Sequence, residues 1–174
     1  MIDRQKPGED AIDSAAWAVL ELARSVLGDL DGERVLERVL ESARELTGAR
    51  YAAIGVLDES RTRLARFITA GVDESARRRI GSPPTRLGVL GELIRNPVPL
   101  RLANVGRHLR SYGFAAGHPP MESFLGVGDG CGVSRSAACL SEKPGARQFS
   151  ELDEQTLVGL SVLVHTCWVA LSHA

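Results

Sequence analysis

The sequence has no long apolar run and almost no net charge, and each absence excludes a class of protein. No run of apolar residues approaches the roughly 18 that a membrane-spanning helix needs. The polar first ten residues contain no signal-peptide core, so we expect a cytoplasmic protein without a membrane partner. The formal net charge of −1 over 174 residues argues against a general nucleic-acid binder.

Cysteine is also scarce. Cys131, Cys139 and Cys167 form no CxxC pair, no zinc-finger spacing and no CxxCH haem-attachment site. An odd number of cysteines in a cytoplasmic chain predicts reduced thiols. Most such cysteines are small core residues, and this is the expectation for all three unless other residues assign them a role.

Hydrophobic periodicity predicts an α+β fold. Helices are predicted at about 14–27, 33–47, 74–80, 87–94 and 151–171, and strands at 51–57, 64–70, 99–102, 124–127 and 133–140. The helix over 33–47 has an apolar stripe that includes Val35, Val39 and Leu46. Because consecutive strands occur near both ends of the chain and helices enclose them, we expect an antiparallel sheet covered by helices.

The length of the chain fits one domain with a substantial core. We predict a disordered tail over 1–11, an N-terminal helix over 12–29 and a single domain over 30–174, with the N- and C-terminal helices together. Phe149, Ser150 and Asp153 have the spacing of a staple and capping box at the start of the last helix. The glycine-rich run 128–132 is expected to interrupt the strand that begins at Phe124.

A long loop around His118 is the most distinctive local feature. Pro119 and Pro120 have fixed φ angles, and the residue before a proline is pushed into an extended conformation. Phe114, Met121 and Phe124 flank this histidine. Imidazole is a common ligand of haem iron, and a porphyrin requires apolar neighbours. From local chemistry, an exposed turn and one face of a haem site are both open interpretations.

Two short segments, one near each end of the predicted domain, resemble the corresponding segments of a known family. The helix-to-strand junction 46–51 and the helix start at 149–153 resemble those of a GAF domain, and the resemblance covers roughly residues 30 to 171. Segments 71–81, 87–102 and 113–127 are similar to the first GAF domain of the mycobacterial dormancy-regulon sensor kinases that bind haem. The last of these segments contains His118-Pro119-Pro120-Met121.

The resemblance implies a sensor that binds haem b without a covalent bond, with His118 as the proximal iron ligand. The pocket residues that it implies are Phe114, Met121, Phe124, Leu87, Leu90 and Cys139. The implied input is a diatomic gas (O2, NO or CO) or redox state, and the implied assembly is a homodimer that signals to a separate effector protein. No kinase segment is present, and Met1 favours a stand-alone protein. His108, His165 and His173 match no ligand of the family.

The sequence departs from the family on the distal side of the implied pocket. The strand ending 138–143 replaces a family segment so that Cys139 falls on the position of the distal tyrosine. A thiol is a weak hydrogen-bond donor but a soft potential ligand. We therefore expect ligand discrimination to differ from that of the family's oxygen sensors.

Two other functions are open. One is a stand-alone GAF enzyme that uses haem, a metal or cysteine chemistry, with Cys131 and Cys139 as candidate catalytic residues and Glu122 and Asp129 as acid/base groups. The cysteine segments of GAF proteins that reduce free methionine sulfoxide are not matched. The other is a haem-free GAF module that binds a different small molecule or serves only to dimerise.

Overall fold

The structure is a computed structural model that describes residues 32–58, 60, 63–75, 78, 88–107, 121–128, 136–145 and 148–172, with only the backbone of 88, 90 and 166–172. The predicted tail over 1–11 and helix over 12–29 lie outside these residues. The described elements are α2 (Gly32–Thr47), β1 (Tyr51–Leu57), β2 (Leu64–Ala70), α4 (Gly88–Arg95), β3 (Leu100–Leu102), the 3-10 helix η1 (Val105–Arg107), β4 (Phe124–Gly128), β5 (Ser136–Ser141) and α5 (Glu151–Ser172).

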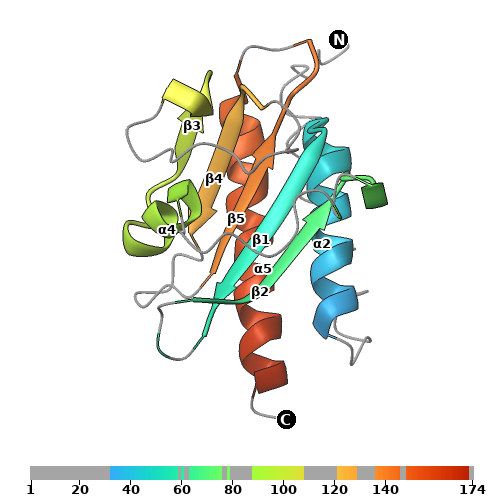
Figure 1. Cartoon of the computed structure of the whole chain (residues 1–174), viewed down its shortest axis with the longest axis vertical. Helices are drawn as coiled ribbons and strands as arrows, with labels where there is room; N and C mark the ends of the chain where they lie inside the picture. Colours follow the sequence, from blue (N-terminus) through green and yellow to red (C-terminus); the bar gives the residue numbers. More distant parts are fainter. Residues whose placement is uncertain are drawn as a thin grey trace, which may run out of the picture.

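The strands form one five-stranded sheet in the order β2-β1-β5-β4-β3, and every neighbouring pair is antiparallel. Helices α2 and α5 lie against one face, while α4 packs on β4 and β5 from the other (Figure 1). The expected α+β fold, an antiparallel sheet covered by helices, is therefore confirmed. The last of the described strands, β5, lies in the middle of the sheet, between β1 and β4.

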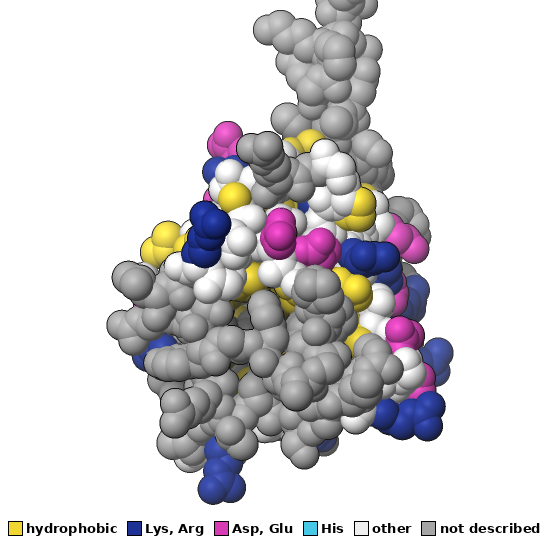
Figure 2. Space-filling model, turned by 45° about the horizontal axis from the view of Figure 1, so that its top comes forward, with side chains coloured by type: hydrophobic (Ala, Val, Ile, Leu, Met, Phe, Trp, Pro, Cys, Tyr) yellow, Lys and Arg dark blue, Asp and Glu magenta, His cyan; other side chains and the backbone are white. Residues whose placement is uncertain are grey.

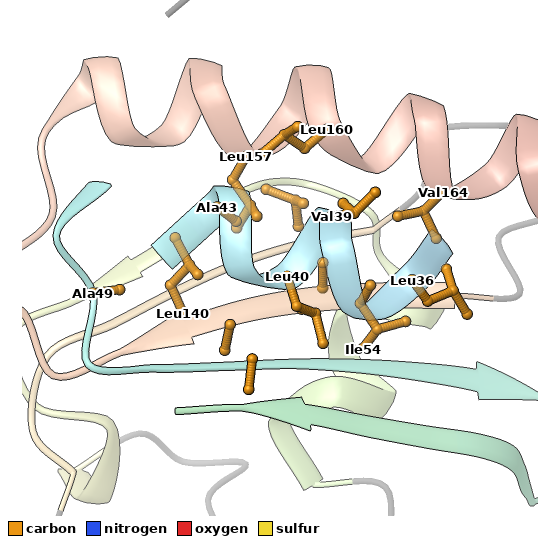
Figure 3. Close-up of a cluster of buried hydrophobic side chains, with 14 of the residues drawn as sticks. Leu36, Val39, Leu40, Ala43, Ala49, Ile54, Leu140, Leu157, Leu160 and Val164 are labelled. Carbon is orange, nitrogen blue, oxygen red and sulfur yellow. The ribbon is translucent and has the colours of Figure 1, made fainter. Parts of the chain in front are cut away.

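The main core lies between α2, α5 and the sheet. Successive side chains of a strand point to opposite faces, so Ile54 and Leu140 enter this core from β1 and β5. Leu36 of α2 lies near Val164 of α5, and Ala43 lies near Leu157, so the two helices run antiparallel (Figure 3). The start of α2 is thus beside the C-terminal half of α5.

At the ends of two elements, one local prediction was wrong and another was correct to within one residue. Leu46 was expected on the apolar stripe of α2, but 37% of it is exposed. The buried residue of the last turn is Thr47, whose hydroxyl donates to the Ala43 carbonyl at 2.6 Å. The glycine-rich run 128–132 was expected to interrupt the strand that begins at Phe124, and β4 ends at Gly128, the first residue of this run, which still pairs with Ala137.

The capping box predicted for the last helix is confirmed. The backbone N–H of Asp153 donates to Ser150 Oγ at 3.1 Å, and the backbone N–H of Ser150 donates to the Asp153 carboxylate at 2.7 Å. Phe149, the residue before the cap, is 2% exposed. The first turn of α5 is therefore fixed by side chains as well as by packing.

The surface of the described residues carries interspersed charges. Figure 2 shows Lys and Arg side chains between Asp and Glu side chains on the face that it presents. Ion pairs such as Arg66–Glu33 and Arg44–Glu41 join opposite charges at 3.3 and 2.6 Å. Within the described segments, no helix is long and apolar enough to cross a membrane.

Candidate functional site

A second apolar cluster lies between α4 and the sheet, on the face opposite the main core. We call it the α4 cluster, and its buried members are Leu57, Leu93, Ile94, Val105, Phe124, Ala137 and Cys139. Met121, Val89 and Leu100 are among the partly buried residues that pack against it. Three residues predicted for the pocket are therefore brought together: Met121 from just before β4, Phe124 from the start of β4, and Cys139 from β5.

The sheet register places these side chains. Cys139 on β5 lies opposite Gly126 of β4 on one side and Ala53 of β1 on the other. Phe124 begins β4 and is 6% exposed. Met121 precedes the strand, and its Sδ accepts a hydrogen bond from Ser141 Oγ at 3.0 Å.

Helix α4 approaches the sheet closely because β4 has glycines beneath it. A Cβ atom at Gly126 would lie 2.3 Å from Leu93 Cδ1, and one at Gly128 would lie 2.7 Å from the Leu93 carbonyl oxygen. Leu93 therefore rests directly on the strand. Leu93 and Ser141 were not among the predicted pocket residues, because neither residue type indicates a binding site by itself.

The remaining predicted site residues fall elsewhere. His118, Phe114, Leu87, Cys131 and Asp129 lie outside the described residues, as do His108 and His173, and the side chain of Leu90 on α4 is not described either. His165 belongs to α5, on the opposite face of the sheet. Glu122 is exposed and does not belong to the α4 cluster.

The Cys139 thiol is strongly held in its neutral form. Burial raises its pKa from 9.0 to about 12, and a hydrogen bond with the Ala53 backbone opposes this shift only in part. The thiolate is the nucleophilic and metal-ligating form of cysteine. At neutral pH, Cys139 is thus suited to be a small apolar residue or a weak S–H donor rather than a nucleophile.

The side chains that the structure describes limit which cofactor the α4 cluster would accept. In the described part of the chain, no group of three or more His, Cys, Asp or Glu side chains could hold a metal ion. A haem places a different demand on the protein, because its porphyrin supplies four nitrogen ligands and the protein needs to add one axial ligand and an apolar wall. Met121, Phe124 and Leu93 fit the apolar wall of such a site.

Comparison with known proteins gives a consistent picture of the fold. Residues 29–128, more than half of the chain, match the family model described as GAF domain. The GAF domain of a phosphoenolpyruvate-protein phosphotransferase from Coxiella burnetii is similar, with a TM-score of 0.79 and 15% identity over 93% of this chain and 96% of that chain.

Two further solved structures show the same likeness. The free methionine-R-sulfoxide reductase from Neisseria meningitidis has a TM-score of 0.74 and 12% identity over 99% of this chain and 96% of its own. The second GAF domain of DevS from Mycobacterium smegmatis has a TM-score of 0.59 and 19% identity over 82% of this chain and 97% of its own. At these identities the likeness concerns the fold alone.

Proposed function

We propose that this chain, which belongs to the GAF domain family, is a haem b sensor of a diatomic gas (O2, NO or CO) or of redox state, with His118 as the proximal iron ligand. GAF domains are a small-molecule-binding sensor fold. The observation that carries the proposal is the grouping of Met121, Phe124 and Cys139 in the α4 cluster. The His118-Pro119-Pro120-Met121 segment, which resembles that of haem-binding GAF domains, supports it from the sequence.

Each residue has a stated role in this proposal. When bound, the haem supplies the iron that binds the gas or changes redox state. His118 holds the iron, while Phe114, Leu87, Leu90, Met121 and Phe124 shield the porphyrin from water. Cys139, whose raised pKa of about 12 keeps the thiol protonated well above neutral pH, would offer an S–H group to the distal side. A thiol is a weaker donor than a phenol, so Cys139 would give the sensed ligand a weaker hydrogen bond than a tyrosine would give at this position.

Hemin reconstitution tests the ligand assignment. The wild-type protein is expected to bind hemin and give a Soret band of a histidine-ligated haem. His118→Ala is expected to lower the hemin affinity at least about tenfold, because the axial ligand is lost. His118→Gly with added imidazole is expected to regain the band.

His108→Ala is the matched control, since it removes another histidine of the segment between Arg107 and Met121. It is expected to bind hemin like the wild type. Identical spectra for the wild type and His118→Ala, or no Soret band for the wild type, would contradict the proposal.

The proposal includes a homodimer formed through α5 and a separate effector protein that reads its state. Val158 and Val162 lie one helical turn apart on α5, and 39% and 49% of these residues are exposed. The wet face of α2 is instead charged, with Glu37 and Arg38 exposed. Two neighbouring exposed valines on one helix favour self-association, because a second copy would bury the same two residues.

Val162→Asp is therefore expected to convert a dimer into a monomer, because it places a charge in the proposed contact. Size-exclusion chromatography with light scattering measures the mass of each species. Val98→Asp is the matched control, since Val98 is 62% exposed but follows α4, away from α5. A monomeric wild type, or a dimeric Val162→Asp variant, would refute this part of the proposal.

A further inference from the structure

Two short segments beside the α4 cluster are tied together by hydrogen bonds. We call this connection, between residues 121–123 and 141–143, the clasp. At its cluster end, Ser141 Oγ donates to Met121 Sδ at 3.0 Å. At its other end, the backbone N–H of Lys143 donates to Ser123 Oγ at 2.9 Å. The clasp therefore begins at a residue that packs against the α4 cluster.

Glu142 occupies the middle of the clasp and bonds in both directions. Its backbone N–H donates to the Ser123 carbonyl at 3.0 Å, and its carboxylate accepts the backbone N–H of Glu122. Its carbonyl accepts the backbone N–H of Arg50 at 2.7 Å. Among the described non-glycine residues, only Glu142 has a positive φ, of 56°. A conformation that side chains rarely adopt persists only where its surroundings hold it.

The clasp continues into the start of α5. Lys143 Nζ lies 2.5 Å from Asp153 Oδ2, and the two side chains are 24% and 7% exposed. The same carboxylate accepts the backbone N–H of Ser150 and so forms half of the capping box. A displacement of Lys143 therefore acts on the group that caps the helix.

We propose that Glu142 is a positioning residue that couples occupancy of the α4 cluster to the N-terminus of α5. This inference rests on the proposed function, because it requires a ligand in that cluster. A ligand that moves Met121 moves the segment 121–123, to which Glu142 is bonded. Glu142 then carries Lys143 with it and changes the Lys143–Asp153 pair. Helix α5 also bears Val158 and Val162, the proposed dimer contact. The clasp therefore connects the proposed ligand site in the α4 cluster to the helix through which two copies associate.

Amide hydrogen exchange of the full chain measures this coupling at the Asp153 N–H. In the ligand-free protein, Glu142→Ala is expected to raise the exchange rate of Asp153 at least about fivefold and to leave that of Leu160 in mid-helix unchanged. Glu122→Ala also replaces a glutamate by alanine, but in the other segment of the clasp, residues 121–123. In the described part of the chain the Glu122 side chain has no hydrogen bond, so this control is expected to exchange like the wild type.

Glu142→Gln is the conservative variant, since its amide oxygen still accepts the Glu122 N–H. It is expected to restore the slow exchange of Asp153. If Glu142→Ala loses its helical circular dichroism, Lys143→Met takes its place, because it keeps the bonds of Glu142 and removes the ion pair with Asp153. Lys143→Met is expected to raise the amide exchange rate of Asp153 by the same factor as Glu142→Ala.

Hemin is the probe for the ligand-bound state, and the Soret band reports its binding separately. In the wild type, hemin is expected to change the exchange rate of Asp153 at least about twofold. In Glu142→Ala the Soret band is expected to remain while this response disappears. A Soret band without a response at Asp153, or a response that persists in Glu142→Ala, would overturn the coupling.

The two proposals fail in different ways. Absence of a Soret band in the wild type refutes the haem proposal. The role of Glu142 is then tested by comparing Asp153 exchange in Glu142→Ala and Glu122→Ala without hemin. In that comparison, equal exchange of Asp153 in Glu142→Ala and Glu122→Ala refutes the role of Glu142.

Discussion

Gly128→Ala is expected to lower the free energy of unfolding by about 3 kcal/mol, the upper end of what an overpacked methyl group typically costs. The new Cβ would lie 2.7 Å from the Leu93 carbonyl oxygen and 2.7 Å from Pro97 Cβ. One of these atoms is backbone and the other belongs to a proline ring, so no change of rotamer relieves the overlap. Helix α4 must instead move away from β4. Urea denaturation of the variant and the wild type measures the loss.

Two other glycines are matched controls for this substitution. At Gly126 the Cβ would meet Leu93 Cδ1 at 2.3 Å and Phe124 Cε1 at 2.8 Å, which are the ends of side chains that can turn. Gly126→Ala is therefore expected to cost about 1 kcal/mol. Around the Cβ position of Gly159, in the middle of α5, nothing lies within 4 Å, so Gly159→Ala is expected to stabilise the protein by about 1 kcal/mol. A Gly128→Ala variant as stable as Gly126→Ala would contradict the described packing of α4.

The helices and strands that could be predicted from the sequence are those that a local pattern of residues specifies. The apolar period of α2 and the spacing of Ser150 and Asp153 each describe one stretch of chain, and both helices begin where the patterns indicated. Strands β1 and β2 were likewise predicted, at the residues where the structure has them. Local patterns therefore sufficed for most of the helices and strands.

The candidate site could be predicted only in part, because it is built from distant segments. Nothing in the local sequence requires β5 to lie between β1 and β4, yet this order is what brings Cys139 beside Phe124. The end of a strand was predicted at the glycine run that begins at Gly128, but the sequence did not indicate that this glycine also admits the backbone of α4. Cys139 came from the family resemblance rather than from its own chemistry, and no local pattern indicates the Ser141–Met121 hydrogen bond.

The stability of the protein is expected to fall above pH 9 through Cys139. Burial raises the pKa of this thiol from 9.0 to about 12 in the folded chain. Between these values the unfolded chain loses the thiol proton and the folded chain keeps it. The unfolded state then binds fewer protons, so the free energy of unfolding decreases as pH rises, by about 1.4 kcal/mol for each unit. The contribution of the protonated Cys139 thiol to the free energy of unfolding is fully present below pH 9.

Cys139→Ala isolates this effect from the titration of other groups. The variant is expected to be less stable than the wild type at pH 8, because it leaves a gap in the α4 cluster. At pH 10 the difference is expected to be smaller by about 1.4 kcal/mol, since alanine does not titrate. Urea denaturation at both pH values measures the change, and Cys139→Ser, which does not titrate in this range either, should show the same narrowing.

A difference that stays constant between pH 8 and pH 10 would mean that the thiol ionises equally in the folded and unfolded chain. Cys139 would then be accessible to water and available as a thiolate, the form that ligates metals and attacks substrates. Its proposed place on the distal side of a haem, as a neutral S–H group, would be lost. The pH dependence of stability therefore distinguishes a passive distal thiol from a reactive one before any ligand is added.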